Sequence, residues 1–420
     1  MHLQPSFGKG RPVGEAIIAN MFAAGDDGRI PLVAVAGTNG KTTTVRLIAH
    51  ILGQQGRRVG MTTTDGVYIE GRRIDTGDCS GPKSARNVLL HPGVDAAVLE
   101  TARGGVLREG LGFDRCDVAV VTNIGLGDHL GLSYISTVED LSVVKRVIVN
   151  NVRPGSGVAV LNAADPMVAR MADSCPGSVT YFAHDRNHPV MAMHRAQRKR
   201  VVYRDGNSIV ASGGGIEYRI ALTDIPVTQA GAIGFQVENA MAAVAAAWAL
   251  GLDWAIIEAG LASFVNDAHT VPGRFNVFSY RGATLIADYG HNPDAIQALV
   301  DAIDNLPSPA GGKRSVVISG AGDRRDEDIR QQTRILGGAF DRVVLYQDQC
   351  QRGRADGEVL ALLQEGLKDA ARTSEIREIH GEFLAIDSAL TELQAGDLCL
   401  ILIDQIEEAL EHIARRVAEA

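Results

Sequence analysis

The sequence predicts two α/β domains, the first a doubly wound, mostly parallel sheet with a small antiparallel β insertion. Three observations predict this fold class. An apolar, β-branched run at 30–36 ends at a glycine, and an amphipathic pattern from 42 to 55 follows it, which indicates a strand, a tight turn and a helix. Apolar runs and helical spacing then alternate along the chain. After Val271-Pro272-Gly273 the same alternation begins again.

The later elements follow in order from local patterns. Buried strands of the first domain are expected at 96–100, 118–123 and 157–161. Short alternating segments with turn signals at 205–207 and 213–215 predict the antiparallel insertion at about 178–221. The alanine-rich stretch 239–250 predicts a buried helix that closes the domain. Strands of the second domain are expected at 283–288, 314–319, 342–346 and 398–403.

The length of 420 residues corresponds to two or three domains at about 150 residues each. The predicted organisation is an N-terminal segment at 1–29, a central domain at 30–271 and a C-terminal domain at 272–420. We find no internal repeat and no low-complexity segment.

Composition excludes several classes of function. The 41 Lys and Arg against 50 Asp and Glu give a net charge of -9, so no global charge favours binding to nucleic acid or to an anionic membrane. The five cysteines are odd in number and widely spaced, which argues against a disulfide framework and a zinc site. No signal peptide and no apolar run of about 20 residues is present. We therefore expect a cytoplasmic protein with no nucleic-acid or membrane partner.

A glycine-rich turn lies between the first predicted strand and the first predicted helix. Backbone N–H groups of such a turn and the helix N-terminus together bind phosphate groups. Lys41 would neutralise the phosphates, and the Thr42 hydroxyl would be a ligand of Mg²⁺. The first domain is thus predicted to carry a phosphate loop that binds ATP through Gly37, Thr38, Asn39, Gly40, Lys41, Thr42 and Thr43.

Polar residues end the neighbouring predicted strands. Glu100 ends one strand, and Asn123 ends another shortly before Asp128 and His129. Parallel sheets place their ligands at this edge, beside the phosphate loop. A carboxylate in that position suits Mg²⁺.

These residues carry a resemblance to a known family. The motifs GTNGKTTT, LETARGG, the segment 123–129 and DYGHNP together resemble the Mur ligase superfamily, in the order of its central and C-terminal domains. The stretches TTTDGVYI, GGVLREGLGFDRCDV, GAGDRRDED and RGRADGE more narrowly resemble the Mur-ligase-like half of the cyanophycin synthetases. The resemblance implies an ATP-dependent carboxylate:amine ligase that makes an acyl phosphate and then an amide.

The resemblance also implies roles for particular residues. Lys41, Glu100, His129 and Lys145 would be catalytic, with Lys145 carbamylated. Thr42 and Glu100 would hold one Mg²⁺, and His129 and the carbamate would serve as further metal ligands. Additional nucleotide contacts would come from Asn239, Arg274, Asp288, His291 and Asn292. Substrate contacts would come from Thr64, Asp65, Arg103, Arg324 and Arg325.

One departure from the superfamily pattern concerns the nucleotide. Phe235-Gln236 precedes Asn239 where the superfamily has His-Asn. About thirty residues precede the first strand, too few for the nucleotide-sugar domain of peptidoglycan Mur ligases.

The sequence leaves three functions open. The first is cyanophycin-type addition of arginine to aspartate β-carboxylates of a polymer or peptide. The second is another Mur-like amino-acid ligase, similar to folylpolyglutamate synthetase. The third is a non-catalytic, nucleotide-binding subunit of a split synthetase. An ATP-grasp partner protein and a homo-oligomer are further expectations.

A basic segment at 194–200 interrupts the acidic chain. Such a run usually faces water. The alternative hypothesis is that it holds a polyanionic acceptor.

Overall fold

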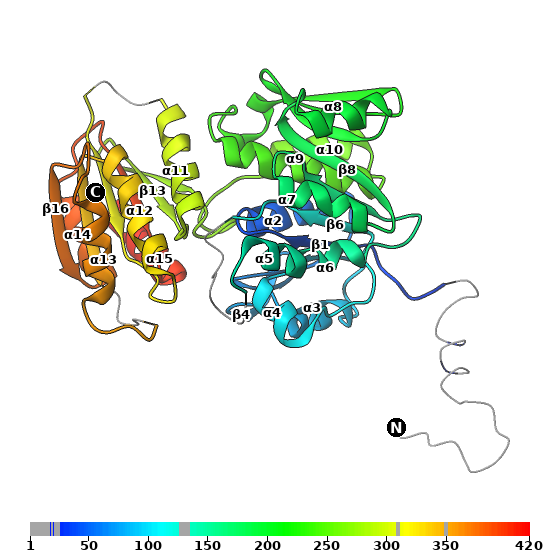
Figure 1. The fold of residues 1–420 in the computed structure, drawn as a ribbon, viewed down its shortest axis with the longest axis horizontal. Coiled ribbons are helices and arrows are strands. Elements are labelled where there is room, and N and C mark those ends of the chain that lie inside the picture. Colours follow the sequence, from blue (N-terminus) through cyan, green and yellow to red (C-terminus); the bar gives the residue numbers. More distant parts are fainter. Residues whose placement is uncertain (1–16, 18–19, 21–25, 126–134, 308–310, 348–351) are drawn as a thin grey trace, which may run out of the picture.

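The structure, a computed structural model, describes residues 17, 20, 26–125, 135–307, 311–347 and 352–420. Two α/β domains lie side by side, the central domain in blue to green and the C-terminal domain in yellow to red (Figure 1). Both domains have mostly parallel sheets, so the predicted fold class is confirmed.

The described residues of the central domain form an 11-stranded sheet in the order β11-β10-β9-β8-β7-β6-β1-β5-β2-β3-β4. Its strands are β1 (Leu32–Ala36), β2 (Val59–Thr63), β3 (Gly66–Ile69), β4 (Arg72–Thr76), β5 (Ala96–Glu100), β6 (Val118–Val121), β7 (Val158–Asn162), β8 (Ser178–Asp185), β9 (Val201–Asp205), β10 (Ser208–Gly213) and β11 (Ile216–Ala221). The phosphate-loop strand β1 lies between β5 and β6 and is parallel to both. The ends of β5 and β6 therefore flank the loop.

Helices cover both faces of this sheet. They are α2 (Lys41–Gln54), α3 (Pro82–Leu89), α4 (Arg103–Glu109), α5 (Val138–Lys145), α6 (Val147–Asn150), α7 (Pro166–Ala169), α8 (Pro189–Ala196), α9 (Gly234–Ala249) and α10 (Trp254–Ser263), with short 3-10 turns η1 (Arg170–Ser174), η2 (Leu222–Asp224) and η3 (Pro226–Thr228). Apolar residues of α2, α9 and α10 form one core with the sheet, and those of α3 and α6 form another on the opposite face. Six alanines of α9 between 240 and 247 are fully buried, and their small size lets this helix pack closely.

The expectation of antiparallel pairing throughout the insertion at about 178–221 was wrong for its first half. Strand β8 is parallel to both β7 and β9, and antiparallel pairing begins only between β9 and β10. The short helix α8, which begins at Pro189, is the crossover that brings β9 back parallel to β8. The turn signals correctly mark the β9–β10–β11 hairpins, where Gly206, Gly214 and Gly215 have positive φ.

The described residues of the C-terminal domain form a six-stranded sheet in the order β12-β13-β17-β14-β15-β16, and among these strands only β12 is antiparallel to its neighbour. Its strands are β12 (Asn276–Tyr280), β13 (Ala283–Asp288), β14 (Arg314–Ile318), β15 (Arg342–Gln347), β16 (Glu375–His380) and β17 (Leu398–Leu402). Its helices are α11 (Pro293–Asn305), α12 (Asp326–Ala339), α13 (Glu358–Leu367), α14 (Glu382–Thr391) and α15 (Ile406–Ala418). Helices α11, α12 and α13 cover one face, and α14 and α15 cover the other.

Polar side chains join the two domains. Asn39 and Asn292, which are 253 residues apart in the sequence, exchange two amide hydrogen bonds of 2.9 and 3.3 Å. Arg73 of β4 pairs with Glu407 of α15. Within the residues that the structure describes, no helix combines the length and apolar character needed to cross a membrane.

Candidate active site

The phosphate loop approaches its neighbours so closely that two positions require glycine. A Cβ atom on Gly37 would lie 1.9 Å from the Thr122 hydroxyl oxygen, and one on Gly40 would lie 2.3 Å from Oδ1 of Asn239. Gly40 also has a φ of 82°, in the left-handed region. The conformation of the phosphate loop therefore depends on these two glycines.

Hydrogen bonds from the end of β6 fix the loop. The backbone N–H of Thr38 donates to the carbonyl of Asn123, and the N–H of Asn39 donates to Oδ1 of the same residue, both at 2.9 Å. Gly125 N–H donates to the Thr38 hydroxyl at 2.8 Å. Asn123, predicted at a strand end, thus shapes the loop from beside it.

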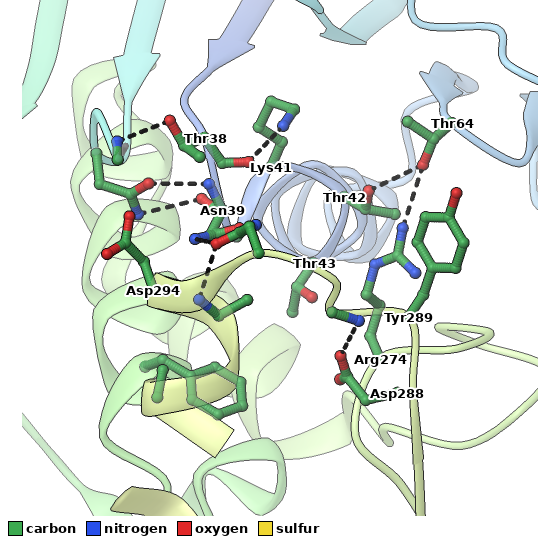
Figure 2. Close-up of a pocket in the computed structure, with 18 of the residues that line it drawn as sticks. Thr38, Asn39, Lys41, Thr42, Thr43, Thr64, Arg274, Asp288, Tyr289 and Asp294 are labelled. Carbon is green, nitrogen blue, oxygen red and sulfur yellow. Dashed lines mark hydrogen bonds between the residues drawn. The ribbon is translucent and has the colours of Figure 1, made fainter. Parts of the chain in front are cut away.

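The Lys41 ammonium and the N-terminal N–H groups of α2 make the end of the phosphate loop positively charged. This helix begins at Lys41, so its N-terminal N–H groups face the same space as the loop. The Lys41 ammonium donates to the Thr38 carbonyl at 2.8 Å (Figure 2). An anion such as a triphosphate is the ligand that this arrangement suits.

Glu100 lies beside the loop with one oxygen engaged and one available. Its Oε2 accepts hydrogen bonds from the Thr42 hydroxyl at 2.9 Å and from the Thr64 N–H at 3.3 Å. Its Oε1 is buried and has no hydrogen-bond partner. Burial raises the pKa of this carboxyl group above its usual range. A divalent cation at Oε1 would satisfy the buried oxygen and favour the ionised form.

These donors fit Mg²⁺ in particular. The described part of the chain has no cluster of three His, Cys, Asp or Glu side chains that could hold a metal. Mg²⁺ is usually bound through one or two carboxylates together with waters and substrate phosphates, so Glu100 and Thr42 beside a phosphate loop meet its needs. Asp128 and His129, the other predicted residues here, lie outside the described residues.

Lys145 is buried rather than solvated. It ends α5, and its ammonium donates to the Gly37 carbonyl at 2.6 Å. A capping box of Thr137 and Asp140 stabilises the N-terminus of α5, and Lys145 extends from the C-terminus of this helix to the phosphate loop. An isolated surface lysine would have no reason to bury its charge in this position.

Four predicted nucleotide-binding residues of the C-terminal domain lie opposite the phosphate loop. Arg274 donates to the Thr64 hydroxyl at 3.3 Å and lies over the Tyr289 ring (Figure 2). Asp288 accepts from the Phe275 and Gly290 N–H groups, and burial raises its pKa to about 6. The others, His291 and Asn292, follow directly in the chain.

His291 is held as a neutral imidazole. Burial, with the nearby charge of Arg324, lowers its pKa to about 3. Nδ1 donates to the Tyr289 carbonyl at 2.5 Å, which leaves Nε2 as a hydrogen-bond acceptor. Asn292 caps α11 by accepting from the Ala295 N–H, and it also pairs with Asn39 of the loop.

A cavity of about 640 Å³ lies between the domains and brings most of the predicted residues together. Its lining from the expected set comprises Thr38, Asn39, Gly40, Lys41, Thr42, Thr43, Thr64, Glu100, Asn239, Arg274, Asp288, His291, Asn292 and Arg324. A volume of this size is typical of small-molecule sites.

Three expected substrate residues do not line this cavity. Asp65 forms a buried ion pair with Arg46, and its oxygens also accept from Tyr68 and Thr63. Arg325 pairs with Asp328 at 2.8 Å instead. Arg103 begins α4. In this structure Asp65 and Arg325 are therefore engaged in local contacts.

Comparison with family models decides the relationship. The Mur ligase middle domain matches residues 35–247, and the Mur ligase glutamate ligase domain matches residues 273–402. The chain belongs to the Mur ligase family. Its members are ATP-dependent ligases that form amide bonds.

Among curated relatives of this Mur ligase, the cyanophycin synthetase of Synechocystis sp. is 40% identical over 417 residues, which cover 99% of this chain and 47% of the relative. The chain thus spans about half the length of the cyanophycin synthetases it matches. The UDP-N-acetylmuramyl-tripeptide synthetase of Deinococcus radiodurans is 28% identical, with 95% of this chain and 79% of the relative covered. Among solved structures, E. coli FolC in complex with DHPP and ADP has a similar fold, with a TM-score of 0.67, 21% identity and coverage of 93% of this chain and 90% of that one.

Among the cavity residues that the sequence did not assign to the site are Gln236 and Glu238, both near the start of α9. Gln236 is fully buried, lines the cavity and has no hydrogen-bond partner for Nε2. Glu238 also lines the cavity, where burial and the charge of Asp165 raise its pKa to about 7. The signal available was position: both residues lie within one helical turn of Asn239.

Proposed function

We propose that this Mur ligase activates a carboxylate with ATP as an acyl phosphate and joins it to the amine of an amino acid. The observation that carries this proposal is the single cavity that the phosphate loop, Glu100 and the C-terminal-domain residues Arg274 and Arg324 share. We further propose that the amine is arginine and that the carboxylate is the β-carboxylate of aspartate in a polymer or peptide. The 40% identity to a cyanophycin synthetase supports this choice of substrates.

The reaction has two steps. A carboxylate oxygen of the acceptor attacks the γ-phosphorus of ATP, the bond from that phosphorus to the β–γ bridging oxygen breaks, and ADP leaves. The deprotonated amine then attacks the acyl carbon, the carbon–oxygen bond to phosphate breaks, and the amide and phosphate are released. On the way from ammonium to amide the nitrogen loses two protons, one released to solvent and one taken up by the leaving phosphate.

The chain's own residues supply positioning and charge for this transfer. Loop N–H groups and Lys41 would hold the phosphates, while Thr42 and Glu100 would hold Mg²⁺. When bound, Mg²⁺ would neutralise charge that develops on the phosphate oxygens. Arg324 would bind the carboxylate of the incoming amino acid as a bidentate partner.

Two further roles rest on the family resemblance alone. Lys145 is proposed to carry a carbamate, which adds an oxygen ligand that the amine lacks. His129 is proposed to bind a second metal ion. The aspartate acceptor is an input to this reaction, and an ATP-grasp partner is its proposed source.

The test is phosphate release and amide formation by the purified chain with ATP, Mg²⁺, arginine and an aspartate polymer. We expect Glu100→Gln to lower ligation by at least about 100-fold, because a neutral amide holds Mg²⁺ poorly. The exposed Glu139→Gln, on α5, is the matched control and should stay near wild type.

Other results would redirect the assignment. Turnover with glutamate and a folate-type acceptor, but not with arginine, would favour the folylpolyglutamate-like alternative. Nucleotide binding without turnover of any carboxylate and amine pair would contradict the proposal and identify a non-catalytic subunit.

A further inference from the structure

Arg354 lies in the segment between β15 and α13, within the RGRADGE stretch, and its side chain is 16% exposed. Nε donates to the Gly322 carbonyl and Nη2 to the Arg324 carbonyl, each at 2.7 Å. Nη2 also bonds to Asp326 at 2.8 Å, and Nη1 bonds to Glu358 at 2.6 Å. One guanidinium therefore ties two backbone carbonyls to the first residues of two helices.

Those carbonyls belong to the loop 319–325, which joins β14 to α12 at the carboxyl edge of the sheet. The loop directs its two arginines differently. Arg324 is 7% exposed, lines the cavity and lies near His291, whose pKa its charge lowers. Arg325 pairs with Asp328 and has a side chain that is 44% exposed. The orientation of the loop backbone therefore decides which arginine faces the cavity.

We propose that Arg354 is a positioning residue for the amino-acid subsite, because it fixes the peptides at Gly322 and Arg324 and so aims Arg324 into the cavity. This inference rests on the proposed function, in which Arg324 binds the amino acid. A guanidinium has five donors in a rigid plane, and Arg354 uses its three nitrogens for four hydrogen bonds to four different residues. Lysine offers a single flexible ammonium and cannot reproduce this pattern.

The chain offers a matched control for a purely structural role. Arg330 of α12 pairs with Glu365 of α13 at 2.7 Å, so it joins the same two helices. Within the part of the chain that the structure describes, the ion pairs of Arg330 are with Glu365 and Glu327 on the helices, and not with the carbonyls of the loop 319–325. Loss of Arg330 should weaken helix packing without moving Arg324.

The experiment compares Arg354→Ala, Arg354→Lys and Arg330→Ala in the ligation assay. For both Arg354 variants we expect the KM for the amino acid to rise by about 10- to 100-fold, because a displacement of about 1 Å can have such an effect. The KM for ATP should stay within about twofold, the range left by surface substitutions. Arg330→Ala should leave both values within the same range. Titration calorimetry with arginine and with a non-hydrolysable ATP analogue gives a second readout. The Arg354 variants should bind arginine more weakly and bind the ATP analogue as wild type does.

Two results would overturn the inference. One is an unchanged amino-acid KM in both Arg354 variants of an active enzyme. The other is an equal rise in both KM values, matched by Arg330→Ala, which would make Arg354 a helix-packing residue. If Arg354→Ala does not fold, Arg354→Lys decides the question. Wild-type enzyme without turnover or arginine binding would instead contradict the proposed function, and the inference with it.

Discussion

Gly40 has little space around its backbone, and this makes its replacement informative. Gly40→Ala puts a side chain into the left-handed region and against Asn239, which is itself held by Thr44 and Gln236. We expect it to lower the free energy of unfolding by about 1–3 kcal/mol. Nucleotide affinity should fall as the loop moves. Urea unfolding and titration with an ATP analogue measure the two effects.

A glycine inside the helix that follows Gly40 gives the opposite prediction. Gly53 lies inside α2 and has nothing within 4 Å of where a Cβ would be. Gly53→Ala should raise the free energy of unfolding by about 0.5–1 kcal/mol, because alanine favours the helix. If Gly40→Ala and Gly53→Ala change the free energy of unfolding in the same direction, the prediction that only position 40 requires glycine is wrong.

Glu238 predicts a pH dependence of stability. Its pKa rises from 4.5 to about 7 on folding, so the folded state favours the protonated form. The resulting stabilisation is complete below about pH 4.5 and is lost as the pH rises through about 7. Glu238→Gln should therefore gain stability relative to wild type between about pH 5 and pH 8. Unfolding of both proteins across this range measures the difference, and a constant difference would contradict the prediction. His184, whose Nε2 lies 3.6 Å from the Glu238 carboxylate, should be monitored by NMR because the two groups titrate together.

At the scale of elements, Asn292 joins a helix cap to a domain contact. Its Oδ1 accepts from the Ala295 N–H at the start of α11, and its amide pairs with Asn39. Asn292→Ala should lower the free energy of unfolding by about 1 kcal/mol through loss of the cap. Asn292→Ser keeps a capping oxygen but is too short to reach Asn39. If the serine variant is as unstable as the alanine variant, the domain contact rather than the cap carries the stability.

The basic segment 194–200 is the end of α8 and the turn after it, not a hairpin. His194 is buried and hydrogen-bonds to the Val179 carbonyl. Arg200 lies over the Trp248 ring at 4.5 Å. Arg198, Lys199 and Arg200 are all exposed, but the Arg200 guanidinium is already engaged by Trp248, so we test the polyanion hypothesis at Arg198 and Lys199.

We expect replacing Arg198 and Lys199 together with Ser to raise the KM for long aspartate acceptors at low salt, with kcat nearly unchanged. Electrostatic attraction to a distant part of the polymer would be lost, whereas the chemistry would not be touched. A short acceptor serves as the control and should show no change. If wild type and the double variant have equal KM values for long acceptors, the segment only faces water and does not bind the acceptor.

Across the whole molecule, local patterns predicted the sheets better than the contacts between distant segments. Strand β1, the phosphate loop and α2 follow from periodicity and glycine within a short stretch. Two parallel strands around α8 could not be told from a hairpin, because strand alternation does not reveal the direction of pairing. The pairing of Asn39 with Asn292 joins residues 253 positions apart and leaves no local pattern. For the same reason the place of Gln236 in the cavity and the four hydrogen bonds of Arg354 are known only from the three-dimensional structure.

The shared cavity also predicts a response of the whole molecule to nucleotide. A ligand that contacts both domains should stabilise both, by about 2.7 kcal/mol when its concentration is 100 times its Kd. An ATP analogue with Mg²⁺ should raise the thermal unfolding temperature of both domains. Limited proteolysis can measure the unfolding of each domain separately. Stabilisation of the central domain alone would show that the C-terminal residues do not bind the nucleotide.

The Arg354 contacts have a consequence for redesign. All four bonds of this guanidinium stay within the C-terminal domain, whereas the phosphate loop belongs to the central domain. Under the proposed function, the choice of amine and the handling of phosphate would therefore depend on two separate domains, which contact each other through polar pairs such as Asn39–Asn292 and through Phe235 against Phe275. A transplant of the loop 319–325 into another ligase should transfer its amine preference only when residue 354 and its two acidic partners travel with it.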